Sequence, residues 1–444
     1  MNRRSFMKTA SAVAAVSAAG ARLDALALQA DTPVPKNDHI QIALIGAGGQ
    51  GQFDTGVALQ IPGTKLLAVA DCYDGRLEHT KEVWGADVFT TRDYNEVLAR
   101  KDIDAVIIAT PDHWHKQAAV DAMRAGKDVY LEKPMIHLYS DGPQIIDTAR
   151  TTGRILQVGS QRVSSIIYGK AKELLASAAI GKLNNVSAYW DRNSAIGAWD
   201  YTVPPDANTE KCDWPRFLGS APKIPFSAEQ FFQWRKWKAY GSGVAGDLFV
   251  HLFSGTHFIT GAHGPTRAMA TGGLRFWNDG RNVPDVMLAL FDYPEGFNLS
   301  LRVNFVDGGA ESAGLTFTGS EGTMEISGQA VTVTRVPREK EPGLMIGTFT
   351  NAMQQKLEAA YREKYPARHA ETMADAFERY SAPEHYNDSY DHFRNFFASV
   401  RSRRPVVEDA VFGFRAAGAA LLSNLSYEQD RIVHWDPETM KLRA

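Results

Sequence analysis

One short segment of this 444-residue chain places polar side chains inside a run of glycines and hydrophobic residues. The segment GSGVAGDLFVHLFSGTH, residues 241–257, contains Asp247, His251 and His257. In a helix that begins at Asp247, Asp247 and His251 lie one turn apart on one face, and His257 lies roughly 80–120° away around the axis. A carboxylate one turn from an imidazole can fix its tautomer and raise its basicity. The segment is therefore a candidate for acid–base chemistry.

Two other interpretations of this acid–histidine pair stay open at the level of sequence. Asp247 and His251 can simply stabilise their helix, or they can bind a metal ion. Zinc normally takes three or four closed ligands, and no Cys-rich or His-x-x-x-His element accompanies these residues. We therefore expect no metal site here.

A second candidate lies in YLEKPMIHL, residues 130–138. Glu132 and Lys133 follow an expected buried strand, residues 128–131, directly before Pro134. The carboxyl ends of strands are where a parallel α/β sheet places its ligands. The alternative is a solvent-facing ion pair at the end of a strand.

The segment HIQIALIGAGGQGQF, residues 39–53, indicates a nucleotide site. An apolar strand runs into Gly46, Gly48 and Gly51, which satisfy G-x-G-x-x-G. The first glycine makes a turn, the second admits a pyrophosphate, and the third permits close packing of a helix whose N-terminus faces the phosphates. Asp71 ends a second apolar strand twenty residues after Gly51, where an acid accepts hydrogen bonds from the adenosine ribose. The alternative is that these glycines serve only as turns.

The elements around these motifs predict the fold of the first half. Apolar strands alternate with amphipathic helices, which is typical of a doubly wound parallel sheet. We predict an NAD(P)-binding Rossmann domain over residues 38–158. Asp71 favours NAD because it would repel a 2′-phosphate, whereas Arg76 keeps NADP open.

The second half, residues 159–444, shows a different pattern. Between 297 and 305, buried and polar residues alternate with period two, and further strands follow one another without intervening helices. We predict an α/β domain with a large, mostly antiparallel open sheet. A charged insertion at about 342–380 either caps the site or serves oligomer contacts, and the C-terminal helices pack back on the core. Five tryptophans form either a sugar-stacking floor or plain core: Trp190, Trp199, Trp214, Trp234 and Trp237.

Composition and the N-terminus set outer bounds. Hydrophobic residues make up 44% and charged residues 22%, which is typical of globular domains. The net charge of -3 argues against nucleic acid as a partner. The chain has two cysteines, Cys72 and Cys212, and Cys72 lies in the expected nucleotide-binding half, which argues against a disulfide framework.

The first thirty residues have the features of an export signal. Arg3, Arg4, Phe6 and Lys8 precede a small-residue apolar stretch, as in twin-arginine signals. We predict a signal over residues 1–30, a linker over 31–37, no membrane anchor after cleavage, and a periplasmic or secreted protein that uses the twin-arginine machinery. An ordinary basic start followed by an amphipathic anchor is the alternative.

Taken together, these motifs resemble the Gfo/Idh/MocA oxidoreductases. The resemblance rests on GAGGQG, Asp71, TPDHWH, LEKP and GSGVAGDLFVH, and covers nearly all of the chain after the signal. DWPRFLGSAPKIPF and the ending HWDPETMKL are similar to exported bacterial members. The resemblance implies an N-terminal Rossmann domain and a C-terminal domain whose open sheet forms the interface of a homodimer or homotetramer.

The resemblance also assigns roles to residues. It implies that His251 takes the hydroxyl proton, Asp247 orients His251, and Lys133 lowers the pKa of the hydroxyl. The expected cofactor-binding residues are Gly46, Gly48, Gly49, Gln50, Gly51, Asp71, Thr110, Pro111, His113, His115, Glu132, Lys133 and Gln161. The expected substrate-binding residues are Arg162, Trp199, Arg235, Trp237 and His257.

Export constrains the expected reaction. No free nicotinamide pool is expected outside the cytoplasm, so the cofactor, NAD or NADP, should stay tightly bound and be recycled on the enzyme. We predict an NAD(P)-dependent oxidoreductase acting on a sugar or sugar-derivative hydroxyl. The alternative is an NAD-dependent glycoside hydrolase that works by transient oxidation, elimination and re-reduction. A protein that only binds sugar or nicotinamide would instead keep Lys133 and His251 apart.

Overall fold

The structure is a computed structural model that describes residues 39–337, 342–343, 345–366 and 376–443. The predicted signal, residues 1–30, and the linker, residues 31–37, lie outside the described residues. Among the helices that the structure describes, none is long and apolar enough to cross a membrane.

The first half forms a six-stranded sheet in the order β3-β2-β1-β4-β5-β6. Every neighbouring pair of strands is parallel. The strands are β1 (Ile40–Ile45), β2 (Thr64–Ala70), β3 (Phe89–Thr91), β4 (Ala105–Ile108), β5 (Asp128–Leu131) and β6 (Leu156–Val158). This order confirms the predicted doubly wound Rossmann sheet.

Helices cover both faces of this sheet, because its central strands carry buried aliphatic side chains on both sides. They are α2 (Gly49–Ala58), α3 (Asp74–Trp84), α4 (Tyr94–Ala99), α5 (Asp112–Arg124) and α6 (Asp141–Thr152). A further helix, α13 (Asp388–Ser402), returns from the end of the chain to this half. Its Phe393 stacks on Tyr130 of β5 with ring centroids 4.2 Å apart.

The second half contains a ten-stranded sheet in the order β14-β13-β12-β11-β7-β10-β9-β8-β15-β16. The pair β7–β10 is parallel and the other recorded pairs are antiparallel. The strands are β7 (Leu183–Asp191), β8 (Arg267–Gly273), β9 (Val286–Asp292), β10 (Asn298–Asn304), β11 (Ser312–Gly319), β12 (Gly322–Ser327), β13 (Ala330–Arg335), β14 (Phe377–Ser381), β15 (Val433–Asp436) and β16 (Lys441–Arg443). The predicted mostly antiparallel sheet is confirmed.

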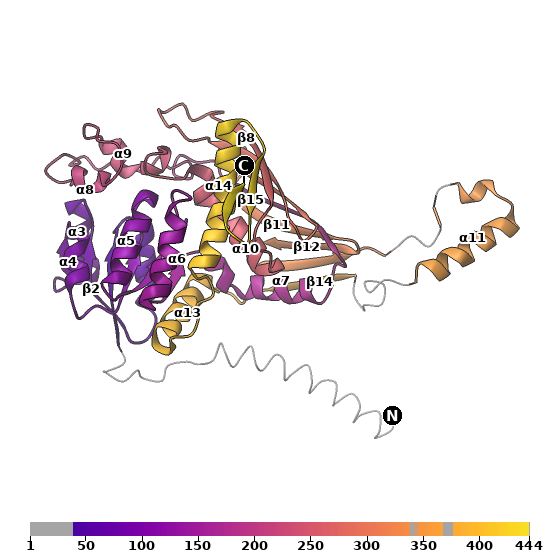
Figure 1. Cartoon of the computed structure of the whole chain (residues 1–444), viewed down its shortest axis with the longest axis horizontal. Coiled ribbons are helices and arrows are strands. Elements are labelled where there is room, and N and C mark those ends of the chain that lie inside the picture. Colours follow the sequence, from indigo (N-terminus) through magenta and orange to yellow (C-terminus); the bar gives the residue numbers. More distant parts are fainter. Residues whose placement is uncertain (1–38, 338–341, 344, 367–375, 444) are drawn as a thin grey trace, which may run out of the picture.

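Helices pack on one face of this sheet (Figure 1). They are α7 (Ile166–Ala176), α10 (Val250–Thr260) and α14 (Ala410–Gln429). In β10 the alternation places Leu299, Leu301 and Val303 in the core beneath them. The opposite face carries exposed aliphatic side chains, Met269, Leu288 and Leu290. The sheet is therefore open on that side.

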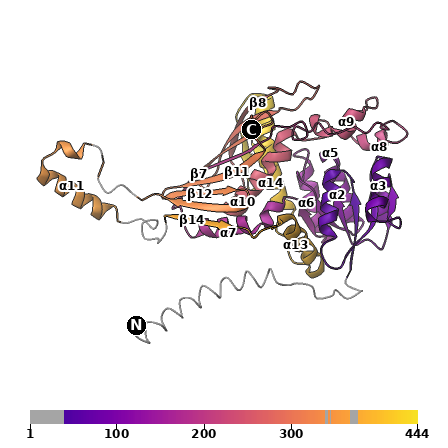
Figure 2. The same cartoon turned by 180° about the vertical axis from the view of Figure 1, so that it is seen from behind.

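The expected insertion, residues 342–380, lies partly outside the described residues. Its described part includes η5 (Ile346–Thr348) and α11 (Asn351–Lys364), none of whose residues is buried. Both views show α11 beyond the end of the large sheet that points away from the Rossmann domain (Figures 1 and 2). Residues 377–381 form β14, an edge strand paired with β13. The described part of the insertion therefore lies away from the Rossmann domain (Figures 1 and 2).

A connecting segment, residues 201–240, lies over one edge of the Rossmann sheet. It contains α8 (Trp214–Leu218), α9 (Ala228–Phe232) and η3 (Trp234–Lys236), and Figure 1 shows α8 and α9 next to the ends of α3 and α5. Cys212 forms an antiparallel bridge with Tyr73 at the end of β2. The Tyr73 hydroxyl donates to Asp206 at 2.6 Å, and Arg216 pairs with Asp93 at 3.1 Å. We call residues 201–240 the covering segment.

Candidate active site

The glycine turn after β1 has the geometry that a dinucleotide requires. Gly46 has a φ of +95°, and a Cβ there would lie 2.6 Å from the carbonyl oxygen of Ala109. A Cβ on Gly51 would lie 2.1 Å from the carbonyl oxygen of Gly46. These two positions therefore exclude any side chain, whereas a Cβ on Gly49 would meet nothing within 4 Å.

The N-terminus of α2 presents unpaired backbone N–H groups to this turn. Gly48 is the N-cap, no side chain caps the helix, and no acidic residue lies in its first turn. A cavity beside it is lined by Gly46, Gly48, Gly49, Gln50, Asp71, Thr110 and Pro111, among others. The positive end of the helix dipole and the open space above Gly49 fit the pyrophosphate of a dinucleotide.

Asp71 at the end of β2 braces the same turn. Its carboxylate accepts hydrogen bonds from the backbone N–H groups of Ala47, at 2.7 Å, and Tyr73, at 2.9 Å. Arg76 lies 3.5 Å from the same carboxylate. Asp71 lines the nucleotide cavity, as expected for a residue facing the adenosine ribose.

Six of the expected cofactor-binding residues do not line this cavity, and two of them, Lys133 and Gln161, line the adjoining cavity described below. His113 contacts the carbonyl oxygen of Phe217 through Nε2 at 3.0 Å, and His115 contacts that of Pro134 through Nδ1 at 2.7 Å. Both imidazoles are therefore used to join backbone segments. Gly51 packs against its own turn, and Glu132 is buried behind the cavity wall.

Glu132 forms a buried carboxyl pair with Asp54 of α2. Burial raises the pKa of Glu132 to about 7, against the opposing field of Lys133. Burial, and then the Glu132 charge, raises the pKa of Asp54 well above its ordinary value. Gln161 donates to Oε1 of Glu132 at 3.3 Å. This pair lies directly beside Lys133 and was not predicted from the sequence.

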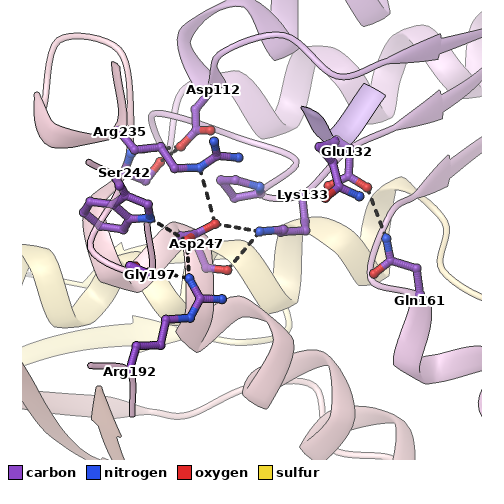
Figure 3. Close-up of polar contacts among 12 residues, drawn as sticks. Asp112, Glu132, Lys133, Gln161, Arg192, Gly197, Arg235, Ser242 and Asp247 are labelled. Carbon is purple, nitrogen blue, oxygen red and sulfur yellow. Dashed lines mark hydrogen bonds and ion pairs between the residues drawn. The ribbon is translucent and has the colours of Figure 1, made fainter. Parts of the chain in front are cut away.

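Asp247 lies at the centre of a cluster of cations contributed by both halves of the chain (Figure 3). The Nζ of Lys133 donates to Oδ1 of Asp247 at 2.8 Å and to its carbonyl oxygen at 3.0 Å. Arg235 approaches Oδ1 at 3.4 Å, and Arg192 approaches Oδ2 at 3.9 Å. Burial would raise the pKa of Asp247, but these three cations outweigh it and hold the pKa well below the ordinary range.

The backbone around Asp247 differs from the predicted helix start. Residues Ala245–Phe249 form a π-helical turn, η4, before α10 begins at Val250, a feature often found at functional sites. Asp112 anchors the preceding loop by accepting from the N–H and the hydroxyl of Ser242, at 2.8 and 2.7 Å (Figure 3). The Nε1 of Trp199 donates to Oδ2 of Asp247 at 2.9 Å.

The sequence predicts that Asp247 orients His251, but the two side chains form no hydrogen bond among the described residues. The carboxylate of Asp247 is instead held by Lys133 and Trp199. His251 Nδ1 has no partner among the described residues, and its ring lies 5.4 Å from that of Trp190. Burial, followed by the charges of Lys133 and Arg162, lowers the pKa of His251 well below its ordinary value. The imidazole is therefore neutral.

A second cavity, of about 1070 Å³, adjoins the nucleotide cavity. The two share part of their walls, including Gly49, Gln50 and Arg235. The sequence-predicted residues that line the second cavity are Gly49, Gln50, Lys133, Gln161, Arg162, Arg235, Asp247 and His251. The structure therefore brings the three proposed catalytic side chains to one cavity that opens towards the nucleotide.

Three expected substrate residues lie elsewhere. His257 is buried on α10, where its Nε2 contacts the Tyr293 hydroxyl at 2.8 Å, because the turn of the helix carries it into the core. Trp237 packs in an aromatic cluster of the covering segment. Trp199 is fully buried and does not line the cavity, but it donates a hydrogen bond to Asp247, which does. Among the described residues, no cluster of three or more His, Cys, Asp or Glu could hold a metal ion.

Four cavity residues had no signal in the sequence. They are Tyr168, Arg192, Glu311 and Asp388. None of them belongs to a recognisable sequence motif. Arg192 follows the end of β7, and Glu311 lies in a loop. Tyr168 lies in the first turn of α7, and Asp388 begins α13. Trp190 also lines this cavity, whereas Trp234 lines the nucleotide cavity.

Comparison with known families agrees with this geometry. Residues 40–160 match the model of the oxidoreductase family with an NAD-binding Rossmann fold, GFO_IDH_MocA. Residues 217–325 match the GFO/IDH/MocA C-terminal domain. The two matches cover more than half of the chain, and NAD is therefore the cofactor of the nucleotide cavity.

Curated proteins of known or assigned activity match part of the chain. The chain is 31% identical over 188 residues to glycosyl hydrolase family 109 protein 2 of Shewanella sp. (strain ANA-3), an alignment covering 38% of this chain and 40% of that protein. It is 32% identical over 145 residues to scyllo-inositol 2-dehydrogenase (NAD(+)) of Bacillus subtilis (strain 168), covering 32% and 42%. The alignments thus span about two fifths of these curated relatives.

The fold is similar over a much larger part of the chain. Levoglucosan dehydrogenase, solved in complex with NADH, superposes with a TM-score of 0.66 at 16% identity. The superposition covers 89% of this chain and 99% of that one. At this identity the likeness establishes the shared architecture.

Proposed function

Because the chain belongs to the Gfo/Idh/MocA oxidoreductase family, we propose that it transfers a hydride between a hydroxyl-bearing carbon of a sugar or sugar derivative and NAD. The observation that carries this proposal is the convergence of Lys133, Asp247 and His251 on one cavity contiguous with the nucleotide cavity. The arrangement does not fit a protein that only binds sugar or nicotinamide, since Lys133 and His251 line the same cavity.

The side chains divide the work as follows. NAD, when bound, supplies the hydride acceptor. His251 is neutral, so it can take the proton of a substrate hydroxyl. Lys133 donates a charge-assisted hydrogen bond to the hydroxyl oxygen and stabilises the alkoxide that develops there. Asp247 positions Lys133 rather than His251, because its carboxylate holds the ammonium group at 2.8 Å.

The covering segment supports tight retention of the cofactor. Tyr201, Phe231 and Phe232 line the nucleotide cavity from this segment. Arg216 and Tyr73 fasten it to the Rossmann half. A nucleotide enclosed in this way would dissociate only when the segment opens, and on-enzyme recycling needs such retention. The arginine near Asp71, Arg76, keeps NADP as the second nucleotide to be tested.

The test begins with purified mature protein, denatured to release and identify any nicotinamide by mass and absorbance. The native sample is then screened against free sugars in the presence of a second carbonyl compound. We expect bound NAD(H) and conversion of a free sugar to its carbonyl product. NADH formed only after NAD is added would overturn retention, and no oxidation of any sugar would overturn the oxidoreductase.

A second candidate is a redox-neutral NAD-dependent glycosidase, favoured by the similarity to the family 109 glycosyl hydrolase. Transient oxidation of a sugar hydroxyl acidifies the neighbouring C–H, which permits elimination of the aglycone, addition of water and re-reduction. The same sample is therefore screened against aryl glycosides. Aglycone release without net change in NAD(H), together with inertness towards free sugars, would select the glycosidase.

We also propose export and self-association. The Arg3–Arg4 segment supports twin-arginine transport to the periplasm or medium. Fractionation of cells that produce the full chain and a variant with both arginines changed to lysine tests this. The exposed Met269, Leu288 and Leu290 on the open sheet support a homodimer or homotetramer. Light scattering of the wild type and Leu290→Glu measures its mass.

A further inference from the structure

We call the second cavity, which Lys133, Asp247 and His251 line, the sugar cavity. Its wall carries more positive than negative charge near these residues. Lys133, Arg162, Arg192 and Arg235 all line it. Asp247 is in contact with three of them and not with Arg162. Arg192 has a second carboxylate, since its Nε lies 3.0 Å from Oε1 of Glu311. The cations other than Arg162 are therefore paired within the protein.

Arg162 has no such partner. No carboxylate of the described residues lies within 4 Å of its guanidinium, and its one hydrogen bond is a 3.5 Å contact to the Tyr168 hydroxyl. The group is partly buried and lies over the Trp190 ring, 4.4 Å from the centroid. Stacking on an indole leaves the N–H edge of a guanidinium available. A desolvated cation with an available edge favours an anion.

Asp388 is the nearest alternative counter-ion. It lines the same cavity and its field acts on Arg162, yet the two groups form no ion pair. Burial raises the pKa of Asp388, and the charge of Arg162 opposes that rise. Arg162 therefore remains available to a ligand that enters the cavity.

We propose that the sugar substrate carries a carboxylate, as in a hexuronic acid, and that Arg162 is the residue that binds it. A single planar guanidinium edge matches a monovalent carboxylate in a bidentate arrangement. A phosphate would need several converging donors, and the neighbouring arginines are already engaged by Asp247 and Glu311. The proposal rests on the proposed function in taking this cavity as the sugar site.

A substrate carboxylate bound to Arg162 would also raise the pKa of His251, the proposed general base. Arg162 and Lys133 are among the charges that lower the pKa of His251. A carboxylate bound at Arg162 opposes that field, so the imidazole of the complex becomes more basic. An acidic substrate thereby prepares its own general base, while a neutral sugar leaves His251 a weaker one.

The test compares D-glucuronate and D-galacturonate with D-glucose and D-galactose, as free sugars and as their aryl glycosides. Variants are Arg162→Met, Arg162→Lys, and Lys172→Met, which removes an exposed cation on α7 away from the cavity. We expect the uronates to be preferred by the wild type. In Arg162→Met their KM should rise roughly 10–100-fold, with KM for the neutral sugars changed less than about threefold. Arg162→Lys should restore part of the loss, and Lys172→Met should behave as wild type.

Binding measured without turnover separates this inference from the proposed function. Calorimetric titration of the holoenzyme with D-glucuronate should show binding that Arg162→Met abolishes, even if no sugar is oxidised or cleaved. The acidic limb of the kcat profile should lie at higher pH with glucuronate than with glucose. Equal losses for acidic and neutral sugars in Arg162→Met, or Arg162-dependent preference for glucose 6-phosphate or a sulfated sugar, would overturn the assignment. Turnover of neutral sugars alone would overturn it while leaving the proposed function intact.

Discussion

Two carboxylates of low solvent exposure, one in each cavity, are held in opposite ways. Asp71 in the nucleotide cavity accepts hydrogen bonds from two backbone N–H groups, that of Ala47 in the glycine turn and that of Tyr73 just after β2. Asp247 in the sugar cavity is held by side chains of Lys133, Arg235, Arg192 and Trp199, which come from four separate segments. One site is built from local backbone, the other from charges that meet only after folding.

The difference teaches where each site is vulnerable. Backbone donors survive most substitutions and fail only where a glycine is replaced, as at Gly46 or Gly51. A charge cluster of this kind fails most severely when its shared anion is removed, because the cations that face it then lose their common partner. Substitutions should therefore affect the sugar cavity more severely than the nucleotide cavity.

The largest effect is expected from Lys133→Met. It removes the cation that we propose stabilises the developing alkoxide, while Arg235 and Arg192 still neutralise Asp247. We expect kcat to fall roughly 10³-fold with the NAD content of the purified protein unchanged. Steady-state kinetics and nicotinamide release measure the two quantities, with Lys172→Met as the control. If kcat of the variant stays within tenfold of the wild-type value, Lys133 does not take part in the chemical step.

Asp247→Asn should come next and should also destabilise the fold. The neutral amide leaves the partly buried Lys133 and Arg235 without their shared anion, while Arg192 keeps Glu311. We expect a cost of about 3–5 kcal/mol, and a misplaced Lys133 that lowers kcat about 10²-fold. The folded-state pKa of Asp247 is depressed, so its contribution to stability is present above the unfolded pKa and is lost as pH falls through the folded value. Denaturant unfolding should show the difference from wild type shrinking on acidification. A constant difference down to pH 3 would contradict this.

These two positions also mark what sequence can predict. The spacing from Gly51 to Asp71 predicts that Asp71 lies beside the glycine turn, because one helix, one turn and one strand connect the two residues. The partner of Asp247 lies 114 residues away, and the π turn at Ala245–Phe249 interrupts the helix on which the pairing with His251 was predicted. Both sheets followed from hydrophobic periodicity. The connections of Arg192 and the burial of His257 depend on tertiary packing, which no local pattern records.

Asp71→Asn sharpens the comparison from the nucleotide side. An amide can accept from only one of the two N–H groups of Ala47 and Tyr73, so the cradle loses about one hydrogen bond. We expect roughly tenfold weaker NAD binding and a stability loss of about 1–2 kcal/mol, both smaller than for Asp247→Asn. Calorimetry on protein stripped of nucleotide gives the affinity, and denaturant unfolding gives the stability. A stability loss greater than that of Asp247→Asn would invert the comparison.

The smallest effect is expected from Glu132→Gln, at a buried position next to Lys133 in the chain. Burial raises the pKa of Glu132 to about 7 in the folded chain, whereas in the unfolded chain it ionises near its ordinary value, about 4.3. The folded state thus binds more protons between these values, so this residue makes the free energy of unfolding fall as pH rises from about 5 to 8. Glutamine does not titrate, so the free energy of unfolding should depend less steeply on pH in the variant.

Asp54 should contribute to the same effect. Its pKa is raised by burial and by the Glu132 charge, so in the variant it should titrate closer to its ordinary value. Denaturant unfolding of the holoenzyme at several pH values measures how the free energy of unfolding depends on pH, with the exposed Glu325→Gln as control. If Glu132→Gln leaves this dependence unchanged, Glu132 and Asp54 are ionised in the native protein. The Glu132 carboxylate would then belong with the paired charges of the sugar cavity.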